Sequence, residues 1–162
     1  MALQGVLGNG SKVGFSAASP VTYTRVGQLM NIEKFIELVA NIVDTTIHST
    51  SNIMTGMPGM IPIPTFEFTL LADFDPATSP THESLRQYSA GSGLSTASTV
   101  LYFRVEVPVL RSQTSFRAWE FQGFVNGYSP SVPIGDKQTV KLTVVFAGGY
   151  VVSSVAGSSL MS

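Results

Sequence analysis

The feature that most constrains the fold is the stretch WEFQGFVNGYSPSVPIGDKQTVKLTVVF, from Trp119 to Phe146. It predicts a strand, an exposed corner and a second strand, because aromatic and β-branched runs flank a segment rich in Ser, Pro and Gly. Just upstream, from Leu101 to Val109, apolar residues alternate with Tyr, Arg and Glu, which predicts a third strand. Pro108 predicts a sheet edge at that end of the strand. We therefore expect a mainly β domain.

Composition indicates that much of the surface is covered by other protein. The 162 residues suit a single domain spanning 1–162. Charged residues make up 12% of the chain, against about 25% in a typical protein, and the mean hydropathy is +0.27. The net charge of −1 leaves no basic stripe with which to grip nucleic acid. Obligate interfaces are large and apolar, so a subunit of an assembly fits this balance.

No catalytic, metal-binding or cofactor-binding site is predicted, and we do not expect an enzyme. The chain has no Cys, and His48 and His82 lack partners at a metal-ligand spacing. Asp73 and Asp75 read as a solvated strand end rather than a cation site. Glu106 or Glu120 is expected to pair with Arg104 or Arg117 as ordinary sheet-surface electrostatics. Neither a signal peptide nor a membrane-spanning segment is recognisable, so we expect a soluble protein made in a cytosol.

The first third of the chain is less regular. Residues 1–20 are expected to form an N-terminal arm with a small hairpin, because Asn9-Gly10 suits a tight turn. Residues 21–29 read as a strand. The next segment, 31–43, has apolar residues at helical spacing but a β-branched end, and periodicity leaves helix and strand equally open.

Residues 48–65 predict a long loop without regular structure. Its Met and Ile side chains suit a surface that orders against a partner, although a crossover that folds back on its own domain is an equal alternative. After a strand at 66–75, Ser79 and Pro80 begin the clearest helix, which ends before Gly91. Leu85 and Tyr88 form its inward face.

The C-terminal stretch resembles the signature of bacteriophage major tail tube proteins, in which a Phe-x-Gly-Phe-Val strand runs into a Pro-Ser-x-Pro corner and an Asp-Lys pair. The matching residues are Phe121, Gly123, Phe124, Val125, Pro130, Ser131, Pro133, Asp136 and Lys137. Upstream, VDTTIHST with Asp44 resembles the family's Val-Asp-x-Thr strand, and FEFTLLADFDP with SPTHESLRQY resembles its central strand and packed helix. The resemblance extends in order from Val26 to Phe146.

This resemblance implies the lambda-type tail tube fold: a β-sandwich or barrel with one flanking α-helix and a long loop. It implies homohexameric rings that stack into the tail tube of a long-tailed phage, a conduit for DNA during ejection. The implied partners are further copies of the chain, the tape measure protein, phage DNA in the lumen, and the tail tip and terminator proteins. The implied location is the virion, after synthesis in the host bacterial cytoplasm, with no membrane partner.

The resemblance also assigns contacts between subunits or rings to the long loop. The loop residues it singles out are Asn52, Ile53, Met54, Met57, Met60 and Ile61. The N-terminal MALQGVLGNG is a second candidate for such contacts. It further implies that Trp119 to Tyr128 is one strand with a bulge at Asn126-Gly127, where the local pattern alone suggests a hairpin turn.

Two alternatives stay open. The chain is also compatible with the inner tube of a contractile tail or type VI secretion system, which shares the fold. From a different class, it is compatible with a carbohydrate- or receptor-binding β-sandwich at a tail tip, for which Trp119 is the candidate contact. For any tube that conducts DNA we expect a neutral or acidic lumen, because a basic lining would bind phosphate.

Overall fold

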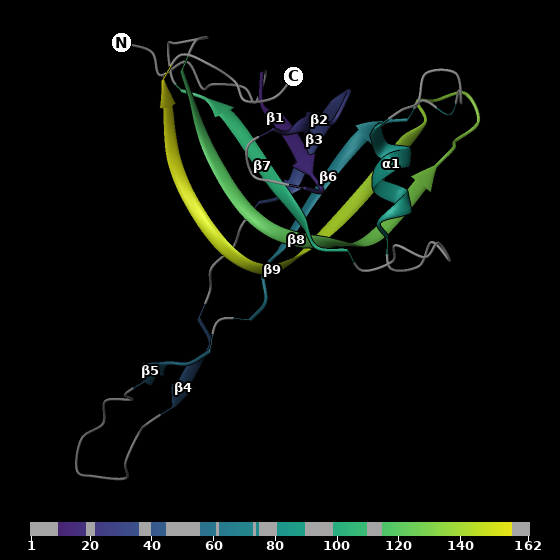
Figure 1. Ribbon diagram of the computed structural model, residues 1–162. Helices are drawn as coiled ribbons and strands as arrows, with labels where there is room; N and C mark the ends of the chain where they lie inside the picture. The colour runs from purple at the N-terminus through teal and green to yellow at the C-terminus, as the bar shows by residue number, and fades with distance from the viewer. Residues whose placement is uncertain are drawn as a thin grey trace, which may run out of the picture.

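The computed structural model describes residues 10–18, 22–35, 40–44, 56–60, 62–72, 74, 81–89, 99–109 and 115–156 (Figure 1). Within them the chain forms a seven-stranded antiparallel sheet, a two-stranded hairpin and one helix. The strands are β1 (Lys12–Ser16), β2 (Thr24–Arg25), β3 (Leu29–Lys34), β4 (Ile42–Asp44), β5 (Gly56–Pro58), β6 (Thr65–Leu71), β7 (Leu101–Pro108), β8 (Ser115–Ser131) and β9 (Thr139–Ala156), and the helix is α1 (Thr81–Gln87). The predicted mainly β fold with one flanking helix is confirmed.

The large sheet has the strand order β2-β1-β7-β8-β9-β6-β3. Its longest strands, β8 and β9, form a hairpin that bends into a U (Figure 1). The outermost strands, β2 and β3, are consecutive in the chain and are joined by residues 26–28. The sheet therefore curls back on itself, but β2 and β3 do not pair, so it stays open and does not close into a barrel.

The predicted strand at 21–29 is confirmed at Thr24–Arg25 but is interrupted by a turn at 27–28, at the corner between β2 and β3. Gln28 there adopts a positive φ of 55°, which ends the extended conformation. The Gln28 carbonyl accepts a hydrogen bond from the Leu71 amide (3.0 Å), and Thr81 Oγ1 accepts one from the Gly27 amide (3.0 Å). These hydrogen bonds to β6 and α1 stabilise the turn, so its conformation depends on residues that are remote in sequence.

Strand alternation places the core on the inner face of the curved sheet. In β6 every second side chain is buried, and β9 repeats the pattern in register. Phe121 stacks between Phe103 and Phe146, with ring centroids 5.6 and 4.3 Å away. Leu85 of α1 closes the core as predicted, and Tyr88 packs beside it. The buried core residues are Val13, Phe15, Val26, Phe66, Phe68, Leu70, Leu85, Leu101, Phe103, Val105, Phe121, Val125, Val140, Leu142 and Val144.

Strand β8 passes through Asn126-Gly127 without turning. Its pairing with β9 shifts register between Val125 and Gly127, so one extra residue bulges from the strand. The predicted single bulged strand is confirmed. Strand β7 lies between β1 and β8, and the predicted sheet edge is found at its Pro108 end, where β8 alone pairs with it among the described residues. Pro108 is tolerated there because it is the last residue of β7, beyond the end of the pairing with β1 at Glu106.

The ambiguous segment at 31–43 contains strand where it is described. Residues 31–34 belong to β3, which pairs with β6, and 42–43 belong to β4. The predicted loop at 48–65 is not wholly irregular, because Gly56–Pro58 forms β5 and Thr65 opens β6. At the N-terminal arm, Gly10 has the positive φ (99°) of a turn, and residues 1–9 lie outside the described residues.

Candidate assembly surfaces

Strands β4 and β5 form a hairpin that projects from the body of the subunit between β3 and β6, here called the β4–β5 arm (Figure 1). Val43 pairs with Met57 across it. At its base the Asn41 amide donates to the Met60 carbonyl (3.3 Å), and the Gly59 amide donates to the Asn41 carbonyl (2.5 Å). A Cβ at position 59 would lie 2.9 Å from that carbonyl oxygen, so glycine is needed where the two strands converge.

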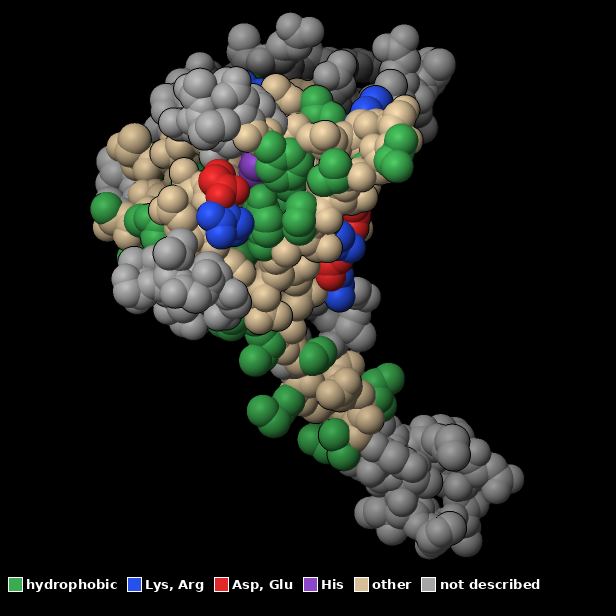
Figure 2. Space-filling view, turned by 90° about the vertical axis from the view of Figure 1, so that its right-hand side faces the viewer, with side chains coloured by type: hydrophobic (Ala, Val, Ile, Leu, Met, Phe, Trp, Pro, Cys, Tyr) green, Lys and Arg blue, Asp and Glu red, His purple; other side chains and the backbone are tan. Residues whose placement is uncertain are grey.

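The β4–β5 arm is apolar and exposed. Its large hydrophobic side chains, with their exposed fractions, are Ile42 (82%), Val43 (52%), Met57 (60%), Met60 (87%) and, at the base, Ile63 (70%). Figure 2 shows hydrophobic side chains along the stalk of the arm. A two-stranded hairpin is marginal in water on its own, and a grouped apolar patch marks a contact with another molecule. The arm has the chemistry of a surface that becomes buried on assembly.

The predicted loop contacts fall on this arm or beyond the described residues. Met57 and Met60 are on the arm and exposed, as expected of contact residues. The other loop candidates, Asn52, Ile53, Met54 and Ile61, lie outside the described residues. Sequence reasoning missed Ile42, Val43 and Ile63. The sequence signal for Ile42 and Val43 was that both are β-branched, which favours a strand. The helical spacing of apolar residues in the segment 31–43 obscured that signal.

The corner between β8 and β9, residues 132–138, is a second exposed apolar feature. Ile134 at its tip is fully exposed, and Val132 is 60% exposed. Gly135 has a φ of 81°, and the Lys137 amide donates to Asp136 Oδ1 (2.7 Å), which fixes the turn. The family-motif residues of this region all lie exposed on the corner or beside it: Pro130, Pro133, Asp136 and Lys137.

Two of the remaining family-motif residues, Phe121 and Gly123, have structural roles. Phe121 is a core residue, and a Cβ on Gly123 would lie 2.8 Å from the Val145 carbonyl oxygen, so the motif's glycine permits close approach of β9. Phe124 is half-buried on β8, and Asp44 ends β4. Trp119, the candidate receptor contact, is half-buried, with its ring 5.0 Å edge-on from Phe35. It packs within the subunit.

A buried ion cluster lies on the outward side of β7 and β8. Arg104 Nε donates to Glu106 Oε1 (2.7 Å), and Arg104 Nη1 pairs with Glu120. The Tyr23 ring lies over the Arg104 guanidinium at 5.8 Å, and burial raises the pKa of Tyr23 to about 12. Arg104 and Glu106 are essentially unexposed. The predicted pairing of Glu106 and Glu120 with Arg104 is confirmed. The predicted surface location is wrong for Arg104 and Glu106, which are buried, whereas the Glu120 side chain is 28% exposed.

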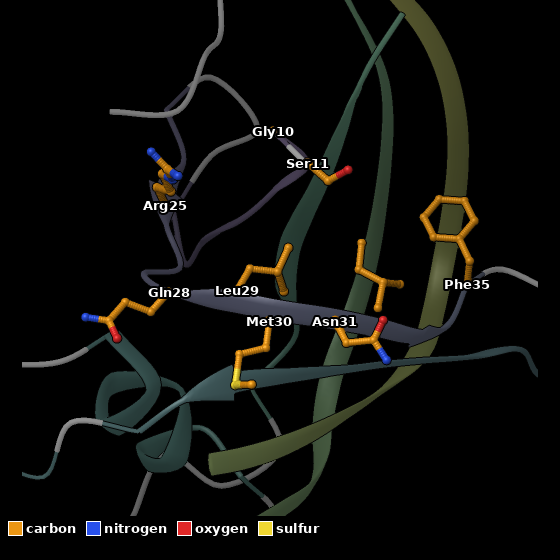
Figure 3. Close-up of a pocket in the computed structure, with 9 residues that line it drawn as sticks. Gly10, Ser11, Arg25, Gln28, Leu29, Met30, Asn31 and Phe35 are labelled. Carbon is orange, nitrogen blue, oxygen red and sulfur yellow. The ribbon is translucent and has the colours of Figure 1, made fainter. Parts of the chain in front are cut away.

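A hollow of about 810 Å³ lies at the seam where the sheet does not close. Figure 3 shows Arg25 and Gln28 at one end of it and Phe35 at the other. It is open and mixed in polarity, with Arg25 as its charged residue. The seam exposes backbone of the two edge strands, which suits pairing or covering by protein.

Among the described residues, no three His, Asp or Glu side chains come together as metal ligands would. No helix among them has the length and apolar character needed to cross a membrane. His82 is buried in α1, with Nδ1 3.3 Å from the Tyr128 hydroxyl. Asp73 and Asp75 lie outside the described residues.

Comparison with known proteins gives a result at the level of the fold. No family model matches the chain, and no curated protein does. Among solved structures, it is similar to a chain in the C6-symmetric tail of an empty gene transfer agent particle (8% identity, TM-score 0.62) and to one in the virion of the native particle (14% identity, TM-score 0.63). Both matches cover 91% of this chain and 98% of the other.

A third similar structure is a chain of the six-fold symmetrised baseplate of the anti-feeding prophage. It has 7% identity and a TM-score of 0.66, over 96% of this chain and 98% of the other. These identities are too low to transfer residue roles, but the coverage is nearly complete on both sides. The chain has, along almost its whole length, the fold found in these tail and baseplate proteins.

Proposed function

We propose that this chain is the structural subunit of a phage-type tail tube, a bacteriophage tail tube protein that forms homohexameric rings stacked into a conduit for DNA during ejection. It is proposed as a virion component made in the host bacterial cytoplasm, not as an enzyme. The observation that carries the proposal is the exposed apolar β4–β5 arm, on a fold shared with proteins of six-fold-symmetric tail particles. An exposed apolar arm would promote aggregation of a monomer, whereas in an assembly a neighbouring subunit can bury it.

The subunit offers the surfaces that such an assembly needs. Strands β2 and β3 are unpaired edges, which neighbours in a ring can pair or cover. The β4–β5 arm reaches away from the body, and the Ile134 corner supplies a separate apolar contact. Contacts between unlike surfaces propagate into rings and filaments instead of closing as dimers. We propose that the tape measure, tail tip and terminator proteins meet the finished tube.

The baseplate neighbour favours a second candidate. In it the chain forms a ring at the baseplate end of a tube, or the inner tube of a contractile tail or type VI secretion system. Both candidates use the same ring contacts. They differ in whether rings of this chain alone continue to stack, and in whether a sheath binds outside.

Sedimentation velocity and negative-stain electron microscopy of the purified protein test the proposal. We expect rings and hollow tubes whose amount grows with protein concentration. Rings that never stack would favour the baseplate candidate. A monomer at all concentrations would refute both, and glycan binding by that monomer would support the receptor-binding alternative.

A further inference from the structure

The curved sheet has two outward surfaces that differ in composition. One, here called the hydroxyl face, is the outward side of β6, of the first half of β9 and of the end of β8. Its polar members are Thr65, Glu67, Thr69, Ser129, Ser131, Thr139, Lys141 and Thr143. They alternate with the core residues of the same strands, so they point away from the core. Leu71, Val145 and Phe124 complete the same side.

The charges of the hydroxyl face neutralise each other. Lys141 Nζ lies 2.5 Å from Glu33 Oε2 and 2.8 Å from Glu67 Oε2. Glu33 also accepts a hydrogen bond from the Thr69 hydroxyl, and the Lys141 ammonium holds the pKa of Glu33 below its usual value. Lys34 pairs in register with Glu67. The carboxylates of Glu33 and Glu67 thus balance the ammonium groups of Lys34 and Lys141, and Lys141 forms an ion pair with each carboxylate.

The other outward surface, over β1, β7 and the first half of β8, is not a free wall. Arg104 and Glu106 point outward from β7 yet are 1% and 0% exposed, so the middle of this side is covered within the subunit. Its margin carries Arg25, which is exposed, and Lys12, whose ammonium lies 5.0 Å from the Phe116 ring. On the hydroxyl face, by contrast, each of the polar residues named above is half-buried or exposed and none is buried.

We propose that the hydroxyl face lines the channel of the assembled tube, and that Glu33 and Glu67 mask Lys141 from the nucleic acid that passes. The inference rests on the proposed tube function and specifies which surface of the subunit forms the inner wall of the tube. A polyanion in a narrow channel binds any uncompensated cation, and copies of that cation around each ring would multiply the effect. A hydroxyl-rich, balanced wall instead keeps water at its surface and holds no phosphate.

The absence of Cys from the chain allows a direct test of position. Ser129→Cys and Thr143→Cys place a thiol on the hydroxyl face, and Ser84→Cys places one on the exposed side of α1 to confirm reactivity. Intact tubes are treated with biotin maleimide, and then with streptavidin before and after dissociation. We expect Ser129→Cys and Thr143→Cys to be biotinylated in intact tubes but to bind streptavidin only after the tubes dissociate.

Two outcomes would overturn the inference while leaving the tube intact. Streptavidin bound to intact tubes would put the hydroxyl face outside. Protection from biotin maleimide in tubes, but not in free subunits, would put it between copies. Failure of the unsubstituted protein to form tubes would instead refute the proposed function, so the two failures are distinguishable.

The charge masking has its own test. The double variant Glu33→Gln, Glu67→Gln leaves Lys141 uncompensated, and its tubes should retain short duplex DNA at low salt in a pelleting assay. Addition of Lys141→Gln to that variant should abolish retention, and tubes of the unsubstituted protein should show none. Equal retention by all three would overturn the masking role.

Discussion

The sharpest prediction concerns Met60 on the β4–β5 arm. Its side chain is 87% exposed, and it is its backbone carbonyl that takes part in the hydrogen bond at the base of the arm. Met60→Asp should therefore change the free energy of unfolding by no more than about 0.5 kcal/mol, as surface substitutions usually do. Its effect is expected on assembly instead.

The size of that effect follows from the area available for burial. A Met side chain buried in a contact contributes about 1.5–3 kcal/mol, and almost the whole side chain is free to be buried. At about 1.4 kcal/mol per tenfold change in an equilibrium constant, loss of the contact raises the critical concentration for tube formation roughly 10- to 150-fold. A carboxylate forced into an apolar contact adds a desolvation cost, so this range is a lower bound.

Pelleting across a dilution series measures the critical concentration, and urea unfolding of the unassembled subunit measures stability. Met60→Leu is the matched control, because it keeps the apolar volume and should assemble as the unsubstituted protein does. Met57→Asp, on β5 of the same arm, should behave like Met60→Asp. An unchanged critical concentration for Met60→Asp would refute the assignment of the arm as a contact.

The remaining predictions concern the subunit itself. Arg104→Met removes the guanidinium that pairs with the buried Glu106 carboxylate and should cost about 3–5 kcal/mol in urea unfolding; a loss below about 1 kcal/mol would contradict a buried pair. Gly123→Ala should cost about 1–3 kcal/mol, because its Cβ meets the Val145 carbonyl, and Gly127→Ala should cost less, because its nearest contact is 3.2 Å away. Burial raises the pKa of Tyr23 to about 12, so the folded protein keeps a proton that the unfolded chain loses from about pH 10. Stability should be fully present below pH 10 and fall as the pH rises toward 12, and Tyr23→Phe should make that fall shallower; an unchanged slope would refute the shift.

Local pattern was a good guide wherever the strand is long and the core lies on one side of it. The alternation in β7 identified its inward residues, and the bulge at Asn126-Gly127 followed from the resemblance. The helix could be located because the pattern that predicts it is local; Leu85 is buried as predicted, and Ser79 and Pro80 lie outside the described residues.

The misses have a common physical cause in contacts between residues far apart in sequence. The turn at Gln28 depends on Leu71 and Thr81, which periodicity cannot reveal. Residues 31–34 become strand because β6 offers them an edge, which outweighs the helical spacing of the segment. The sequence could not predict the burial of Arg104 and Glu106 either, because alternation predicts which side of a sheet a residue faces and not whether that side is covered.

A three-dimensional reconstruction of the assembled protein by electron cryomicroscopy tests the central claim most directly. We predict a hollow tube of six-fold rings, with density for the β4–β5 arm against a neighbouring copy and the hydroxyl face turned toward the axis. A reconstruction with another symmetry and no channel, or arms that extend into solvent without contact, would contradict the account.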